Sequence, residues 1–404
     1  MHKELATSKR FVVVLGLLTG LVAFAIDICL PAIPPMVESL GTTMASGQQV
    51  VGLFLAGIAV GQLPFGLLSD RLGRMPVLYA GVSLFTIAGI ATSIVDSIEI
   101  MLFARFVQGV GSSAGLVLAR AIVRDISSGA DAARLMSIMV MIFTAAPMLA
   151  PMFGSFLVSA WGWRVPFAAT VVAGMLVLYG INTSLRETHT PKNSQHILRQ
   201  LINSLRLFFT HRQSVYGVLL IMTTVVGSMA VVSGSAALII EIYNIPVKYF
   251  GLFIALNGVA ILTGSSINRR LLARFDALQM IGAGATIAVI AGAQLLIMAW
   301  RGEAELWWLW GSVTTYMLGH SFLVPNATAM ALDPVPEIAG VAASVIGTCQ
   351  SVAGASSAII CSSLYTGTIA NVASFVGCAG AAAFILFLLR HRVMRSAAVS
   401  ADAG

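Results

Sequence analysis

Asp27 and Arg105 are the residues of this sequence best suited to chemistry, because each lies inside a long run of apolar residues. A charged side chain in hydrocarbon is costly unless it pairs or faces a water-filled cavity, so such residues mark functional sites. Both stand about 10 Å below the same end of their predicted helices, at a rise of about 1.5 Å per residue. Equal depth favours an ion pair, and we predict that Asp27 carries a proton beside Arg105. Two alternatives stay open: Asp27 is hydrated or only ties two helices together, and the Arg105 guanidinium extends to the lipid headgroups.

A second charged cluster stands in the stretch from Gly66 to Pro76, which separates two apolar runs. A short charged turn bracketed by glycines marks a point where a chain leaves a membrane and re-enters it. Further along the chain, Arg120 and Arg124 are four residues apart, so their guanidinium groups share a helix face and are placed to meet Asp70. We expect Asp70 to pair with one of them and to cap the helix that begins near residue 340. The predicted gate consists of Asp70, Arg71, Arg74, Arg120 and Arg124.

Small residues and prolines form a third pattern. Ala146, Ala150 and Gly154 recur at helical spacing, with Pro147 and Pro151 between them. Small residues allow close helix contact in lipid, and the prolines loosen a helix where it bends or packs tightly.

The composition excludes a soluble globule. Hydrophobic residues make up 58% of the chain and charged residues 10%, whereas soluble domains carry roughly 25% charged residues. A bilayer crossing needs about 20 apolar residues. Twelve apolar runs predict spanning helices near residues 11–35, 48–68, 77–95, 100–121, 135–160, 164–184, 213–240, 248–267, 278–300, 307–327, 338–364 and 370–390.

The basic residues gather on one side of these predicted spans. If the first ten residues lie inside and sides alternate, only Arg164, Lys248 and Arg301 fall outside. Cytoplasmic loops carry the excess of Lys and Arg, so we predict that both termini are cytoplasmic. The net charge of +7 is thus explained by topology rather than by nucleic acid binding.

The chain also repeats itself. Gly52-Leu53-Phe54 recurs as Gly251-Leu252-Phe253, after a polar linker. A duplicated six-helix unit is a transporter architecture. The same register puts Val226 opposite Asp27 and Ala304 opposite Arg105, so the ionisable chemistry belongs to the first copy. We predict an N-terminal half at 1–184, a cytoplasmic linker at 185–212, a C-terminal half at 213–390 and a cytoplasmic tail at 391–404.

Three of these segments resemble motifs of the major facilitator superfamily. The loop around Asp70 reads G-x-x-x-D-R-x-G-R and resembles motif A, and the R-x-x-Q-G-x-G that begins at Arg105 resembles motif B. In the family, the Arg of motif B governs the protonation of a nearby acid. The segment with Pro147, Pro151 and Gly154 resembles motif C, which is associated with antiporters, although this chain has Ala146 where the family form has glycine. The resemblance implies an all-α membrane protein with two six-helix halves around a central cavity.

The stretch around Asp27, x-D-x-x-L-P-x-x-P, resembles the first helix of bicyclomycin-resistance-type drug/proton antiporters of this superfamily. Arg186-Glu187-Thr188, where the sixth span ends, is similar to that group as well. The resemblance implies proton-coupled efflux of small amphiphilic compounds across a bacterial inner membrane, by a monomer whose partners are substrate, protons and lipid. The alternative is export or uptake of one metabolite, such as an amino acid derivative or a siderophore.

The predicted substrate cavity is apolar and adaptable, because flexible Met and aromatic side chains repack around unlike ligands. Its candidate residues are Phe24, Phe106, Gln108, Met222, Met229, Tyr316 and His320. A lone intramembrane His such as His320 is more often a hydrogen-bonded packing residue than a relay member. The sequence contains no Walker A string, no H-E-x-x-H, no G-x-S-x-G and no Cys/His cluster with metal spacing. We therefore expect no enzyme activity, cofactor or metal.

Overall fold

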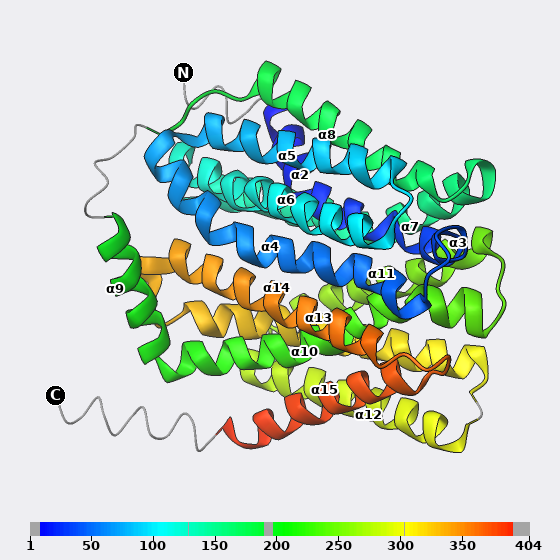
Figure 1. The fold of residues 1–404 in the computed structure, drawn as a ribbon. Helices are drawn as coiled ribbons and strands as arrows, with labels where there is room; N and C mark the ends of the chain where they lie inside the picture. The colour runs from blue at the N-terminus through cyan, green and yellow to red at the C-terminus, as the bar shows by residue number, and fades with distance from the viewer. Residues whose placement is uncertain (1–8, 128, 190–196, 303, 391–404) are drawn as a thin grey trace. The chain divides into compact units, whose positions relative to one another are not determined.

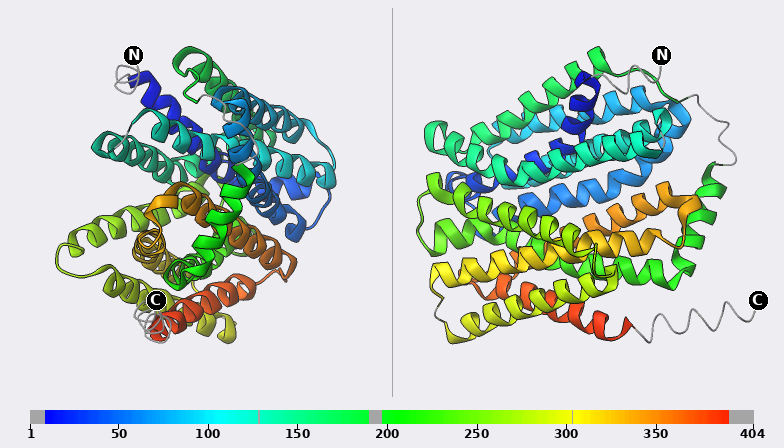
Figure 2. Two further views of the ribbon diagram at one scale, coloured as in Figure 1. Left: turned by 90° about the vertical axis from the view of Figure 1, so that its left-hand side faces the viewer. Right: turned by 180° about the vertical axis from the view of Figure 1, so that it is seen from behind.

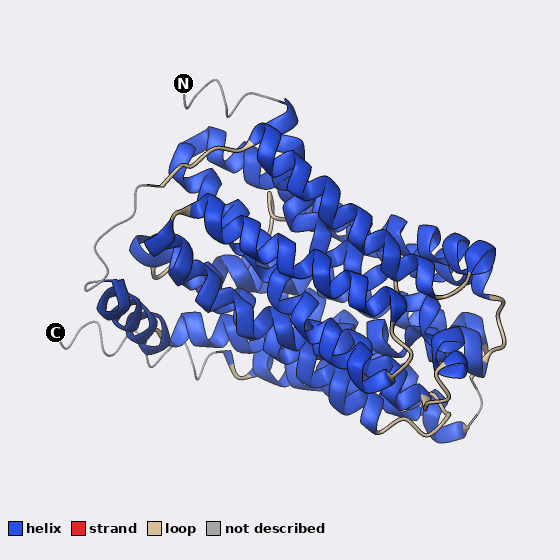
Figure 3. Ribbon diagram, turned by 45° about the horizontal axis from the view of Figure 1, so that its top comes forward, coloured by secondary structure: helices blue, strands red, loops and turns tan. Residues whose placement is uncertain are grey.

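The computed structural model describes residues 9–127, 129–189, 197–302 and 304–390. Every regular element among these residues is a helix, and loops join the helices (Figure 3). The predicted all-α class is confirmed. The chain divides into two compact units, Met1–Ile197 with Ile239–Ala255 and Leu198–Leu238 with Leu256–Gly404.

The helices follow one another with short connections, as Figure 1 shows. The first part of the chain forms α2 (Lys9–Asp27), η1 (Leu30–Ala32), α3 (Ile33–Ser39), α4 (Met44–Leu72), α5 (Arg74–Ile94), α6 (Ile98–Ile126), α7 (Gly129–Trp161) and α8 (Arg164–Ser184). The second part forms α9 (Ile197–Thr210), α10 (Arg212–Ala236), the π-helix η2 (Ala237–Ile242), α11 (Val247–Leu271), α12 (Ala277–Arg301), α13 (Leu306–Leu332), η3 (Pro336–Ile338), α14 (Ala339–Ser363) and α15 (Ala370–Leu388).

Eleven helices in the described part of the chain are long and apolar enough to cross a membrane. They match eleven of the predicted spans, with ends that differ by a few residues. The remaining prediction, 307–327, falls within α13, which has 27 residues but is not among the eleven. Trp, Thr, Gly and His lower its mean hydropathy. The number twelve therefore stays a prediction.

Glycines set the spacing of the helices in the first unit. A Cβ atom on Gly57 of α4 would overlap the Phe106 carbonyl oxygen of α6, and one on Gly109 would overlap the Phe54 carbonyl oxygen. Gly61 packs in the same way against Ser113. Only residues without a Cβ permit such close backbone approach. Gly57 and Gly61 therefore hold α4 close to α6.

The second unit repeats these contacts. Gly264 of α11 packs against Ser321 of α13, as Gly61 packs against Ser113. A Cβ on Gly319 of α13 would meet the Gly284 carbonyl oxygen of α12 at 2.8 Å, which parallels the approach of Gly111 to Phe85 between α6 and α5. The two units are thus copies of one helix arrangement.

The contacts of this second copy also correct a detail of the predicted register. The correspondence of Ser321 to Ser113 puts Val313, and not Ala304, opposite Arg105. Val313 is fully buried. The offset is therefore not constant along the two copies, but the position opposite Arg105 is still apolar.

The first predicted span is broken rather than continuous. α2 ends at Asp27, and a turn leads through η1 into α3. Pro31 explains the break, because a proline ring collides with the carbonyl of the residue four positions before it, which here is Asp27. The carboxyl group of Asp27 therefore stands at a helix end inside the span.

Two features of the observed division differ from the predicted one. Residues 239–255, predicted in the C-terminal half, group with the first unit. The backbone N–H of Gly251 donates to the Ser155 hydroxyl of α7 at 3.0 Å, which explains this grouping. The predicted linker contains a helix, α9, that was not expected.

Candidate functional site

Asp27 lies buried at the end of α2, with 6% of its surface exposed. The residues that follow it at the helix break, Ile28, Cys29 and Ala32, belong to a buried hydrophobic cluster that also includes Phe167 of α8. Within the described residues its carboxyl group forms neither an ion pair nor a hydrogen bond with another side chain. A buried carboxyl without a fixed partner can change its protonation state without breaking a structural contact.

Arg105 is fully buried in α6 and is held by neutral groups. Its Nη1 donates to the Gln108 Oε1 at 2.8 Å, and its Nη2 donates to the Ala25 carbonyl oxygen at 3.1 Å. The guanidinium also lies 4.4 Å from the centre of the Phe54 ring, a distance at which the ring attracts a cation. These contacts compensate part of the cost of a buried charge.

The predicted ion pair between Asp27 and Arg105 is absent from the described structure. Arg105 reaches α2 one half-turn before the acid, at the Ala25 carbonyl. Depth along a helix is the same for both residues, but the direction in which each side chain points is different. Arg105 and Asp27 are thus on helices that contact each other, but the two charged groups do not pair.

Gln108 belongs to this buried network and not to an open cavity. It is fully buried, and its Nε2 donates to the Thr170 hydroxyl of α8 at 3.0 Å while its Oε1 accepts from Arg105. The chain of contacts connects α6, α2 and α8 in the first unit. Phe24 and Phe106, the other cavity candidates of this unit, are half-buried.

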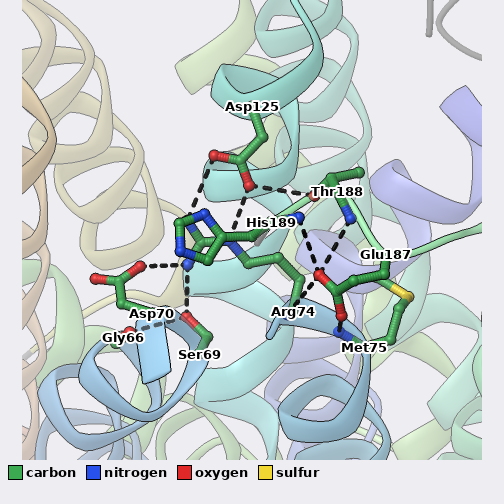
Figure 4. Close-up of polar contacts among 9 residues, drawn as sticks. All are labelled: Gly66, Ser69, Asp70, Arg74, Met75, Asp125, Glu187, Thr188 and His189. Carbon is green, nitrogen blue, oxygen red and sulfur yellow. Dashed lines mark hydrogen bonds and ion pairs between the residues drawn. The ribbon is translucent and has the colours of Figure 1, made fainter. Parts of the chain in front are cut away.

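A second cluster surrounds Arg74 at the start of α5 (Figure 4). The side chain is 7% exposed. Its Nε donates to Asp125 of α6 at 2.8 Å, and its Nη1 donates to Asp70 at 2.5 Å and to the Ser69 hydroxyl at 2.8 Å. One guanidinium therefore ties the end of α4, the start of α5 and the end of α6 together.

Glu187, just after α8, completes this cluster. Its carboxylate accepts from the backbone N–H groups of Arg74 and Met75, both at 2.9 Å, and from those of Thr188 and His189. The free N–H groups at a helix start favour an anion. Burial opposes ionisation, but the four donated hydrogen bonds outweigh it and lower the pKa of Glu187. The residue stays ionised at neutral pH.

Gly73 allows the carboxylate of Glu187 to approach. Its φ of +93° is unfavourable for other residues, and an added Cβ would stand 2.7 Å from the Glu187 Oε2. We expect Gly73→Ala to lower stability by about 2 kcal/mol, from backbone strain and displacement of the carboxylate. Thermal unfolding of the purified protein would measure this. Gly311→Ala is the control, because nothing lies within 4 Å of the added atom, and an equal effect of both changes would contradict the assignment.

The predicted gate differs from the observed cluster in its partners. Asp70 pairs with Arg74, four residues further along, and not with Arg120 or Arg124. The α6 residue that reaches the loop is Asp125, and Arg71, Arg120 and Arg124 are exposed. Sequence reasoning missed the roles of Asp125 and Glu187. The signal for both was an acid at a helix end close to a loop with two arginines.

The segment with Pro147, Pro151 and Gly154 lies within α7, which continues through both prolines. A Cβ on Gly154 would overlap the Ile28 carbonyl oxygen, just after Asp27. The predicted tight packing is therefore confirmed at Gly154, and it is directed at the break in the first span. The hydroxyl of Ser155, the next residue, accepts the hydrogen bond that the Gly251 backbone N–H donates.

The second unit contains a buried polar group around Thr224 of α10. The Tyr316 hydroxyl donates to the Thr224 carbonyl oxygen at 3.0 Å, and His320 lies one helical turn further along α13. The His320 Nδ1 is buried without a partner in the described part. Tyr316 is fully buried, which excludes it as an open cavity wall, whereas Met222 and Met229 are half-buried.

These features define a class of protein. Long apolar helices in two copies of one arrangement, with an acid and an arginine buried within the spans, form a multi-pass membrane transporter. No group of three or more His, Cys, Asp or Glu side chains in the described residues is arranged to hold a metal ion.

Comparison with known proteins identifies the family. The sequence model of the Major Facilitator Superfamily matches residues 15–358, and the chain belongs to this superfamily. It is 27% identical to a bicyclomycin resistance protein homolog from Haemophilus influenzae over 388 residues, which are 96% of this chain and 97% of that protein. It is 26% identical to multidrug resistance protein D of Escherichia coli over 343 residues, 85% of this chain and 86% of that protein.

A solved structure shows the same fold. The crystal structure of a D-xylose-proton symporter superposes with a TM-score of 0.73 at 16% identity, covering 95% of this chain and 97% of that one. Its sequence identity is low, so this likeness concerns the fold alone. The predicted superfamily and the predicted fold class are both confirmed.

Proposed function

We propose that this protein exports small amphiphilic compounds in exchange for protons. The observation that carries the proposal is similarity over most of the chain to a bicyclomycin resistance protein homolog and a multidrug resistance protein. Membership of the superfamily implies a small-molecule substrate and a lipid environment. We therefore propose transport without chemical conversion of the substrate.

Asp27 is the proposed proton carrier. Ionisation of a carboxyl group is disfavoured away from water and favoured when water enters. Alternating exposure to the two sides of the membrane would therefore load and release a proton at this residue. Its position at a helix end, beside a proline that interrupts the span, supports this role.

The cluster around Arg74 is the proposed gate on the inner side. Arg71, Arg120 and Arg124 add positive charge around it without being part of the buried ion pairs. We place both termini in the cytoplasm, because this loop and most basic residues then lie inside. We further propose that the protein is a monomer in the bacterial inner membrane.

Expression in a drug-sensitive bacterial host without pumps of its own tests the proposed function. We expect raised tolerance to two or more chemically unrelated amphiphiles, because half-buried residues such as Phe24, Met222 and Met229 give adaptable apolar surface. The measurement is the lowest inhibitory concentration of each compound, with an empty vector and Asp27→Asn as controls. Unchanged tolerance to every drug, together with saturable transport of one metabolite, would favour the alternative of a dedicated carrier.

A further inference from the structure

α9 (Ile197–Thr210) has an exposed apolar row that no part of the transport mechanism uses. Ser204 and Phe208 are buried and face the protein, with Phe208 fully covered. Ile202 and Phe209 are 57% and 53% exposed on a neighbouring row. Arg206, which is exposed, lies next to them on the helix surface. Protein contact, exposed apolar surface and positive charge thus follow one another around the helix.

The position of α9 is set by α10, in the same compact unit. α9 ends at Thr210 and α10 begins at Arg212, the first residue of the span Arg212–Ile242. α9 runs across the direction of α10 in both views (Figures 1 and 2). A helix that turns directly into a membrane span lies at the level of the lipid headgroups.

The start of α10 is also fixed in place. The Gln213 Nε2 donates to the Met330 carbonyl oxygen near the end of α13 at 3.0 Å. The exposed Arg212, the first residue of α10, adds a second positive charge at the junction of the two helices. α9 therefore stays where its apolar row and two guanidinium groups can reach lipid.

We propose that α9 lies in the headgroup region of the leaflet at which α10 begins and binds anionic lipid. Ile202 and Phe209 insert among the acyl chains, and Arg206 and Arg212 bind lipid phosphates. An amphipathic helix gains energy from apolar burial and from attraction to anionic headgroups. This inference does not depend on which compound the protein transports.

A bound protein would be a poorer fit to this row. Two exposed apolar side chains on two turns of helix are far smaller than a stable protein interface, which buries about 800 Å² on each partner. The membrane is already adjacent, because the next helix crosses it. Lipid can therefore cover this row without the entropy loss of binding a protein from solution.

Fluorescence quenching in the full-length protein tests the proposal. The background variant replaces Cys349 and Cys378 and keeps Cys29 and Cys361, which are buried. An environment-sensitive probe is attached after Ile202→Cys or, as a matched control, after Asn203→Cys. Both positions are exposed on the same helix, but they point in directions about 100° apart.

In nanodiscs, we expect nitroxide-labelled lipids to quench the probe at position 202 and iodide to quench the probe at position 203. Equal quenching of both probes by iodide would show that α9 stands in water and would overturn the proposal. A probe at 202 that is protected from both quenchers would show that protein covers the row, which would also overturn it.

A second comparison tests the recognition of anionic lipid. Phosphatidylglycerol, in place of phosphatidylcholine, is expected to raise the lipid-inserted fraction of the probe at 202. Arg206→Gln should reduce this gain by about five-fold, since one basic residue near an anionic surface is worth about 1 kcal/mol. Lys248→Gln is the charge-matched control, because Lys248 of α11 follows the end of the span Arg212–Ile242 that is opposite to Arg212. Equal gains in both variants would overturn the assignment of Arg206 to anionic lipid.

Discussion

Asp27→Asn is expected to abolish proton-driven transport while the protein stays folded. Asn has nearly the same shape as Asp but cannot release a proton. The carboxyl group forms no ion pair with a described residue, so the substitution removes no structural contact. Proteoliposomes with an imposed pH gradient would measure the loss as substrate accumulation that no longer follows the gradient.

Two controls make this result specific to Asp27. Glu38→Gln removes an exposed acid of α3 in the same unit and should leave coupling intact. Substrate exchange at equal pH on both sides should persist in Asp27→Asn, because exchange needs no net proton movement. Full accumulation by the Asn variant would rule out Asp27 as the proton carrier.

Arg74→Gln is expected to lower the stability of the first unit markedly. The change leaves Asp125 and Asp70 facing each other without their shared cation. Removal of one partner from a buried ion pair costs about 3 to 5 kcal/mol. The Asp70 and Asp125 side chains are 42% and 18% exposed, so water lowers the expected cost to about 2 kcal/mol.

Thermal unfolding of the purified protein in detergent would measure this cost. Arg71→Gln is the matched control, because Arg71 is the exposed neighbour in the same loop and its loss should change stability by less than about 0.5 kcal/mol. Asp125→Asn in the Arg74→Gln background should restore part of the loss by removing the repulsion. Equal melting temperatures for the two single arginine variants would mean that the buried ion pairs do not hold the loop.

Much of the fold could be predicted from the sequence, because the bilayer imposes a length and a polarity on each span. Eleven predicted spans and the tight packing at Gly154 follow from patterns within one helix. Pro31 also indicated a break after Asp27, but the apolar run continues on both sides of it, so a single continuous span was predicted. α9 was missed because its apolar residues are interrupted by polar ones and fall within a stretch read as linker.

The contacts of the site were harder to predict, because they depend on rotation about helix axes. Equal depth suggested a pair between Asp27 and Arg105, yet Arg105 binds the Ala25 carbonyl instead. Likewise, the positions of Arg120 and Arg124 near the loop suggested partners for Asp70, but Arg74 takes that place. Spacing along the chain fixes which helix end a residue occupies, not the direction of its side chain.

The contact between α4 and α6 has a genetic consequence. Every change of the Gly57 or Gly109 codon that alters the amino acid adds a Cβ atom, and that atom would overlap a backbone oxygen of the neighbouring helix. A backbone cannot move aside as a flexible side chain can. Amino acid substitutions at these two codons should therefore not be tolerated. Substitutions at the codon of Gly311, which has open space around it, should be tolerated.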